Sequence, residues 1–130
     1  MPYMFKVALF GVREILPSFR FPNAAFDFET WFFRRVLPKF WVMQICGLEE
    51  LKSSMATGVV VVTPNIIFPE YIKTLVYRIR RSGFSRKILI FSPPGTKYQG
   101  GGKIEGVFFL DTDDMSEIIN AIRTHCLLFL

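Results

Sequence analysis

The sequence predicts a doubly wound α/β domain, in which helices cover both faces of a five-stranded parallel sheet. Residues 59–62 are four consecutive valines, a pattern typical of a strand that is buried on both faces. Other short apolar runs alternate with segments of helical periodicity, and this alternation indicates crossover connections between parallel strands. The chain has 130 residues, of which 51% are hydrophobic, so we expect one packed domain that spans residues 1–130.

The first part of the chain predicts one strand and one helix. The apolar run 5–10 predicts the first strand, and residues 12–22 are expected to be irregular because prolines interrupt them. Asn23 or Asp27 can cap the first helix, since short polar side chains accept hydrogen bonds from the first turn. Pro38 ends this helix near residues 36–37.

The middle of the chain predicts two strands and two helices. Residues 40–46 predict a second strand, and residues 48–55 predict a short helix with one apolar face. The third strand is expected over 59–63. A longer helix begins at Pro69, a residue suited to a first helical turn, and Gly83 is its expected C-terminal cap.

The last part of the chain predicts two strands and a final helix. Strands are expected over 87–91 and 107–110, and a glycine-rich loop over 93–106 separates them. Asp114 and Glu117 have the spacing of a capping box, so we expect the final helix to begin there.

The order of these elements predicts a flavodoxin-like sheet with strand order 2-1-3-4-5. In such sheets, ligands bind in the crevice beside the carboxyl ends of the strands. The residues at those ends are Gly11, Thr63, Ser92 and Thr112, which we take as the candidate ligand-binding residues.

Charge and cysteine content narrow the classes of function. The formal net charge of +5 is compatible with an anionic partner, but the basic residues form no long block, so direct binding to nucleic acid is not expected. With only Cys46, Cys126 and His125, a disulfide scaffold or a zinc site is not expected. No apolar run is long enough for a membrane span, and no signal peptide is evident, so we expect a cytoplasmic protein.

Several segments resemble, in order and spacing, the receiver domain of two-component response regulators. The segments are 44–51, 58–63, 87–92 and 109–118. They resemble the family's second strand and helix start, its third strand, its fourth strand, and its fifth strand with the entry to the last helix. The resemblance implies the same doubly wound fold and a role in signal transduction.

The chain departs from the family at the positions that carry phosphoryl chemistry. Gly11 and Val12 occupy the positions of the magnesium-binding acids, and Glu14 alone is a poor magnesium cage. Thr63 occupies the position of the phosphorylated aspartate, and Thr112 that of the conserved lysine. Only Ser92 matches the functional set. The resemblance therefore implies a degenerate receiver, a pseudo-receiver, that is not an enzyme and needs neither a metal nor another cofactor.

Two surfaces are candidates for protein contacts. The segment 19–33 is too rich in aromatic residues for one helix stripe to bury, so it predicts either a partner surface or an internally folded segment. Its candidate interface residues are Phe26, Phe28, Trp31 and Phe32. Arg78 and Arg81 belong to a basic cluster that is either a solvated helix end or a site for an anionic partner.

These observations predict a receiver-like regulatory domain that acts through protein contacts, as a homodimer or through a partner or linked effector. The alternative is binding of a small phosphorylated ligand or a nucleotide at the carboxyl ends of the strands, with the loop 95–103 beside them. The glycines of this loop lack the spacing of a phosphate-binding loop, so a simple connecting loop is also compatible with them.

Overall fold

Five parallel strands form a single sheet at the centre of the molecule. The computed structural model describes residues 6–45, 47–64, 69–96 and 104–127, so the expectations for Phe5, Cys46 and residues 97–103 lie outside the described residues. In chain order, the strands are β1 (Val7–Gly11), β2 (Met43–Ile45), β3 (Gly58–Val62), β4 (Ile88–Ser92) and β5 (Val107–Asp111).

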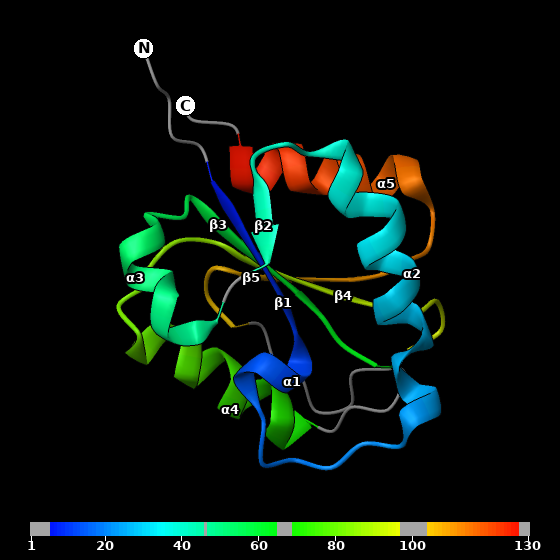
Figure 1. Ribbon diagram of the computed structural model, residues 1–130, viewed down its shortest axis with the longest axis horizontal. Coiled ribbons are helices and arrows are strands. Elements are labelled where there is room, and N and C mark those ends of the chain that lie inside the picture. Colours follow the sequence, from blue (N-terminus) through cyan, green and yellow to red (C-terminus); the bar gives the residue numbers. More distant parts are fainter. Residues whose placement is uncertain (1–5, 46, 65–68, 97–103, 128–130) are drawn as a thin grey trace.

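The strand order is β2-β1-β3-β4-β5, and every neighbouring pair is parallel, which confirms the predicted flavodoxin-like architecture (Figure 1). The valines of β3 lie between β1 and β4 and are completely buried. This position explains the unbroken apolar run, because a central parallel strand contacts helices on both of its faces.

Two groups of helices enclose the sheet (Figure 1). On one face lie α1 (Val12–Ile15), α3 (Leu51–Ser54) and α4 (Pro69–Arg81), and on the other lie α2 (Asp27–Val36) and α5 (Met115–Ile122). Each face has its own apolar core. Val59 and Val61 belong to the first core and Val60 and Val62 to the second, since successive side chains of a strand point to opposite faces.

The predicted helix signals act as expected at two helix ends, but neither Asn23 nor Asp27 caps α2: its N-cap is Phe26, which makes no capping side-chain hydrogen bond. The Asp114 carboxylate accepts hydrogen bonds from the backbone N–H groups of Ser116 and Glu117 at the start of α5. Gly83 follows α4 with a φ of 103°, a left-handed conformation that a residue without a Cβ adopts easily.

Three local predictions were wrong in detail. Residues 12–15, expected to be irregular, form the one-turn helix α1, which is too short to produce a periodic pattern. The strand expected over 40–46 pairs only at Met43–Ile45, because β2 is an edge strand with β1 as its only neighbour. The helix expected over 48–55 is divided into a 3-10 turn at Leu48–Glu50 and the single turn α3, which ends at a left-handed Met55.

Candidate functional site

The carboxyl edge of the sheet brings the four predicted ligand-binding residues together. Gly11 ends β1 and pairs with Val62, so Thr63 follows directly beside it. Ser92 ends β4 and pairs with Asp111, which Thr112 follows. All four residues are buried. The sequence prediction therefore located a real cluster, in the position where doubly wound folds bind ligands.

The hydroxyl groups of this cluster are engaged by the protein's own backbone. The Phe91 carbonyl oxygen accepts from both the Thr63 N–H (2.8 Å) and the Thr63 hydroxyl (3.2 Å). The Thr112 hydroxyl oxygen accepts from the Asp114 N–H (3.0 Å) and so helps to start α5. These two side chains close the ends of the strands and stabilise local turns.

A carboxylate from α2 lies at the same edge and was not foreseen. A Cβ added to Gly11 would lie only 2.7 Å from the carboxyl carbon and Oε1 of Glu29, and 2.8 Å from Oε2. The missing side chain of Gly11 is therefore the space that the Glu29 carboxyl group occupies. Glu29 Oε2 is buried and has no hydrogen-bond partner among the described residues.

The surroundings of Glu29 favour its protonated form. Burial is the largest cause and the nearby Glu14 carboxylate adds to it, while Arg13 acts in the opposite direction; together they raise the pKa of Glu29 to about 7. The Arg13 guanidinium itself lies over the Phe26 ring, 3.4 Å from its centroid. A carboxyl group with such a pKa changes its charge near neutral pH, which is an uncommon property for a glutamate.

The burial of Glu29 has little signal in the amino-acid sequence. Glu29 lies in the first turn of α2, where an acid is ordinary because it complements the helix dipole. Its burial depends on the close approach of α2 to the end of β1, which only the tertiary structure supplies. The one available signal was Gly11 at the end of a buried strand, since a glycine there often marks a close contact.

The side chains at this edge do not fit the magnesium site that a receiver would need. Gly11 and Val12 offer no ligands, and Glu29 is about half protonated at neutral pH. Among the residues that the structure describes, no group of three or more acidic, histidine or cysteine side chains could hold a metal ion. Magnesium binds hard oxygen ligands in a strict octahedron, which Glu14 and Glu29 cannot supply alone.

The structure separates the predicted interface residues into two kinds. Phe26 and Phe32 are buried in the two cores, and Phe32 packs against Phe91 with ring centroids 5.1 Å apart, so both serve the interior of the domain. Phe28 and Trp31 are half-buried and stacked on each other at 5.6 Å, which leaves part of this pair open to a partner.

The two predicted arginines also differ. The Arg78 guanidinium donates to the Ile15 carbonyl oxygen at 2.8 Å and thereby links α4 to the end of α1. The Arg81 guanidinium is exposed and donates to the Tyr77 hydroxyl at 2.8 Å. Both arginines line a shallow groove with Leu48, Glu49 and Ser82, in which the acidic Glu49 makes an anionic ligand less suitable.

Comparisons of the chain with protein-family models, with curated proteins and with solved structures gave no match. Among the described residues, no helix combines the length and the apolar character that crossing a membrane requires.

Proposed function

We propose that this chain is a receiver-like regulatory domain that acts through protein contacts and is not switched by phosphoryl transfer. The observation that carries the proposal is Thr63, which stands at the end of the central strand, is fully buried, and donates its hydroxyl proton to the Phe91 carbonyl oxygen. A neutral hydroxyl that already donates to a backbone carbonyl is a weak nucleophile, whereas the phosphorylated residue of a receiver is a carboxylate.

The stacked pair Phe28 and Trp31 on α2 supports the contact part of the proposal. Partly exposed aromatic rings anchor many protein interfaces, because they bury a large area with few rotatable bonds. We propose a homodimer as the first partner to test. A cytoplasmic location belongs to the same proposal and agrees with Cys126, whose buried thiol has a pKa raised to about 12 and stays protonated.

Phosphoryl analogues test the absence of the switch. The intact protein is treated with magnesium and beryllofluoride while its backbone amide NMR spectrum is recorded, and with magnesium and acetyl phosphate before mass spectrometry. The expected result is no added phosphoryl mass and no saturable change in the spectrum. A magnesium-dependent, saturable change centred on the carboxyl edge of the sheet would contradict the proposal.

Sedimentation equilibrium tests the contact surface. If the domain is a dimer through α2, Phe28→Ser combined with Trp31→Ser weakens association by about tenfold or more, because the loss of an aromatic anchor costs at least 1–2 kcal/mol. Tyr77→Ser is the matched control, since Tyr77 is an exposed aromatic residue on α4. A monomeric wild type, or equal weakening by the control, would exclude this dimer.

Glu29 favours a second candidate function, binding of a small ligand at the carboxyl edge. Its buried Oε2 has no hydrogen-bond partner among the described residues. The carboxyl group lies at the end of β1, next to β3, where the strand order of the sheet reverses. A carboxylate there suits a ligand with a cation or hydrogen-bond donor better than a phosphorylated one. A thermal-shift series with amines, nucleotides and sugar phosphates tests this, since only a ligand of the folded state raises the melting temperature with concentration. A flat response to all three classes would exclude it.

A further inference from the structure

The amino edge of the sheet, opposite to the crevice, presents a row of cations. The register and the backbone bonds place Lys6 before β1, Thr57 before β3 and Lys87 before β4, so that Thr57 donates its N–H to the Lys6 carbonyl oxygen and Val59 donates to that of Lys87. Neighbouring strands lie about 4.8 Å apart, so these residues form one continuous line. Lys87 and the adjacent Arg86 are exposed.

The ends of the helices add further cations to this edge. α2 and α4 run back toward the amino edge with basic residues in their last turn, and further basic residues lie in 37–39, in α3 and just after α5. These residues are Arg34, Arg35, Lys39, Lys52, Arg80, Arg81 and Arg123. Acidic residues lie among these cations too: Glu105 is offset by the nearby Arg80, and Glu49 lines a groove with Arg81.

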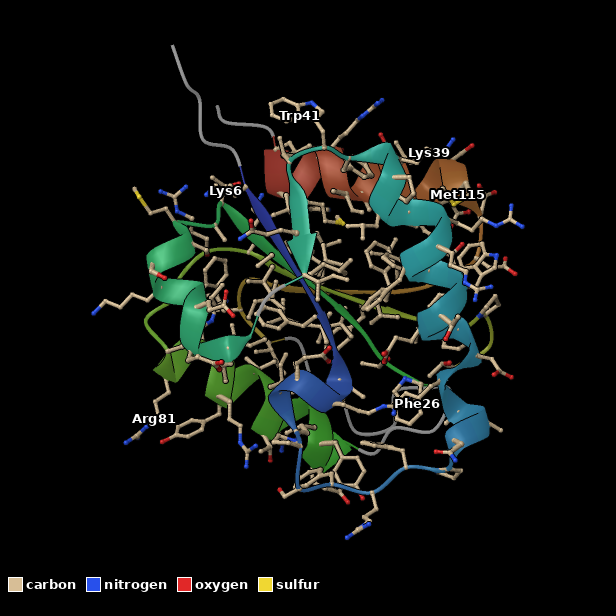
Figure 2. All side chains as sticks on the ribbon, in the orientation of Figure 1. Lys6, Phe26, Lys39, Trp41, Arg81 and Met115 are labelled. Atoms are coloured by element: carbon tan, nitrogen blue, oxygen red, sulfur yellow. The ribbon has the colours of Figure 1, made fainter. Side chains whose placement is uncertain are left out.

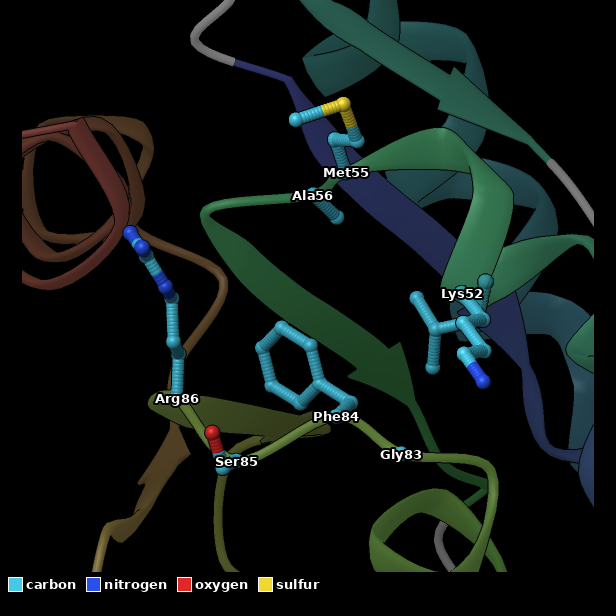
Figure 3. Close-up of a pocket in the computed structure, with 8 residues that line it drawn as sticks. Lys52, Met55, Ala56, Gly83, Phe84, Ser85 and Arg86 are labelled. Atoms are coloured by element: carbon cyan, nitrogen blue, oxygen red, sulfur yellow. The ribbon is translucent and has the colours of Figure 1, made fainter.

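Apolar side chains protrude among these cations. Trp41, between α2 and β2, is 91% exposed, and Met55, after α3, is 75% exposed. Figure 2 shows Trp41 on the same margin of the molecule as Lys6 and Lys39. Met55 lines a recess of about 150 Å³. Figure 3 shows two other residues of this recess, Lys52 and Arg86, on either side of Phe84. Exposed apolar side chains of this size are costly in water unless a partner covers them.

Both ends of the described chain leave from this edge. Thr57 lies between these two ends: its Oγ1 is 3.0 Å from the Lys6 carbonyl oxygen and 2.9 Å from the Cys126 carbonyl oxygen. The amino edge therefore combines positive charge with exposed apolar side chains.

We propose that the amino edge binds the surface of an anionic lipid bilayer. Tryptophan favours the boundary between headgroups and acyl chains, and Trp41 and Met55 would enter that boundary. The surrounding lysines and arginines face the anionic headgroups, and each contributes attraction within a Debye length. A bilayer also matches the flat end of a sheet, because it demands no complementary shape.

The same features fit nucleic acid less well. The cations are spread over one end of the molecule, and the groove that Arg81 lines also contains the acidic Glu49. Methionine offers neither a stacking plane nor a hydrogen-bond donor to a base. His125 adds no charge, since burial and the neighbouring Lys87 lower its pKa and its ring stacks on Phe108 with centroids 4.2 Å apart.

Vesicle binding tests the proposal. The full chain is sedimented with vesicles of phosphatidylcholine alone and with vesicles that contain equal parts of phosphatidylcholine and phosphatidylserine, at low and at physiological salt. Binding to the anionic vesicles that weakens with salt, without binding to the neutral ones, is expected. In the Trp31→Phe variant, where Trp41 is the remaining tryptophan, emission should shift to shorter wavelength on the anionic vesicles.

Matched variants identify the surface. Arg86→Glu with Lys87→Glu should weaken vesicle binding by about 25-fold or more, at about fivefold for each cation lost. Arg20→Glu with Lys73→Glu makes the same change of net charge at exposed positions away from this edge and should weaken it much less. Trp41→Ser with Met55→Ser should weaken it by tenfold, whereas Ile45→Ser should have little effect.

Three outcomes overturn the proposal. One is equal sedimentation with neutral and anionic vesicles or with neither. Another is equal loss of binding in the two charge-reversed pairs, which would make the attraction a property of net charge. The third is tighter binding to a DNA duplex than to anionic vesicles at the same salt, with loss of both in the same variants, which would assign the surface to nucleic acid.

Discussion

The two edges of the sheet differ in whether their side chains are bonded within the protein or exposed to solvent. At the carboxyl edge, the Thr63 and Thr112 hydroxyl groups are buried and bonded to the protein's own backbone. At the amino edge, Trp41 and Met55 extend into solvent among lysines and arginines. The edge that holds ligands in related architectures is thus closed by internal bonds, and the edge that usually serves only to connect elements is left open.

The charges follow from the same topology. α2 and α4 begin near the carboxyl edge with acidic residues and end near the amino edge with basic ones, as the helix dipole favours. In a parallel sheet the crossover helices run in the same direction, so the charge preferences at their ends add up. A charge separation over the whole molecule therefore needs no special selection, although its combination with Trp41 and Met55 at one end does not follow from helix formation.

The largest expected effect is at the closed edge. Thr63→Asp introduces a carboxylate where the side chain is fully buried and beside the Phe91 carbonyl oxygen, which would repel it. We expect a loss of about 3 kcal/mol or more in the free energy of unfolding at neutral pH, measured by urea titration, and no phosphorylation by acetyl phosphate. Thr63→Val should lose less than about 1 kcal/mol, because the Thr63 N–H still bonds to Phe91. A stable, phosphorylated Thr63→Asp protein would show that the edge is open.

A smaller effect should distinguish two glycines at opposite ends of neighbouring strands. A Cβ on Gly58, at the amino end of β3, would lie 2.6 Å from Cys126 Cβ and 3.0 Å from its Cα, so part of the backbone must move. Gly58→Ala should cost about 1–3 kcal/mol by chemical denaturation. Gly11→Ala should cost less than Gly58→Ala, since it meets only the movable end of Glu29. The reverse order would contradict the packing described for both sites.

Glu29 predicts a pH dependence. Because its pKa in the folded protein, about 7, exceeds the unfolded value of 4.5, the folded state binds more protons between these two values. The free energy of unfolding should therefore fall as the pH rises from 4.5 to 7 and level off above 7. Glu29→Gln should remove this slope and raise stability at pH 8 by on the order of 1 kcal/mol or less, since the side chain is only half-buried and water screens its charge. Parallel slopes for wild type and variant would exclude Glu29 as the cause.

The smallest expected effect is at the open edge. Trp41→Ser with Met55→Ser should change the free energy of unfolding by less than about 0.5 kcal/mol for each substitution, because both side chains make few contacts within the chain. Thermal unfolding followed by circular dichroism measures this. A loss of several kcal/mol would mean that these side chains belong to the fold, and would remove them from any docking surface.

The fold could be predicted because its signals are local. The valines of β3, the cap at Asp114 and the left-handed Gly83 each depend on a few neighbouring residues, and their order determines the topology. The positions of Gly11 and Thr63 at the crevice follow from strand ends alone. The role of Glu29 could not be predicted, since it results from the approach of α2 to β1. The burial of Phe32 and the exposure of Trp41 were equally hidden, because both are aromatic residues in aromatic-rich sequence and differ only in tertiary contacts.

The Thr57 hydroxyl, which bridges the carbonyl oxygens of Lys6 and Cys126, has a consequence for how this unit can be joined to other proteins. The places where the polypeptide enters and leaves the fold are neighbours, so the unit can be inserted into a loop of a host protein without forcing the host's two flanks apart. In such a fusion both connections to the host would lie at the amino edge of the sheet, and the carboxyl edge would face away from the host.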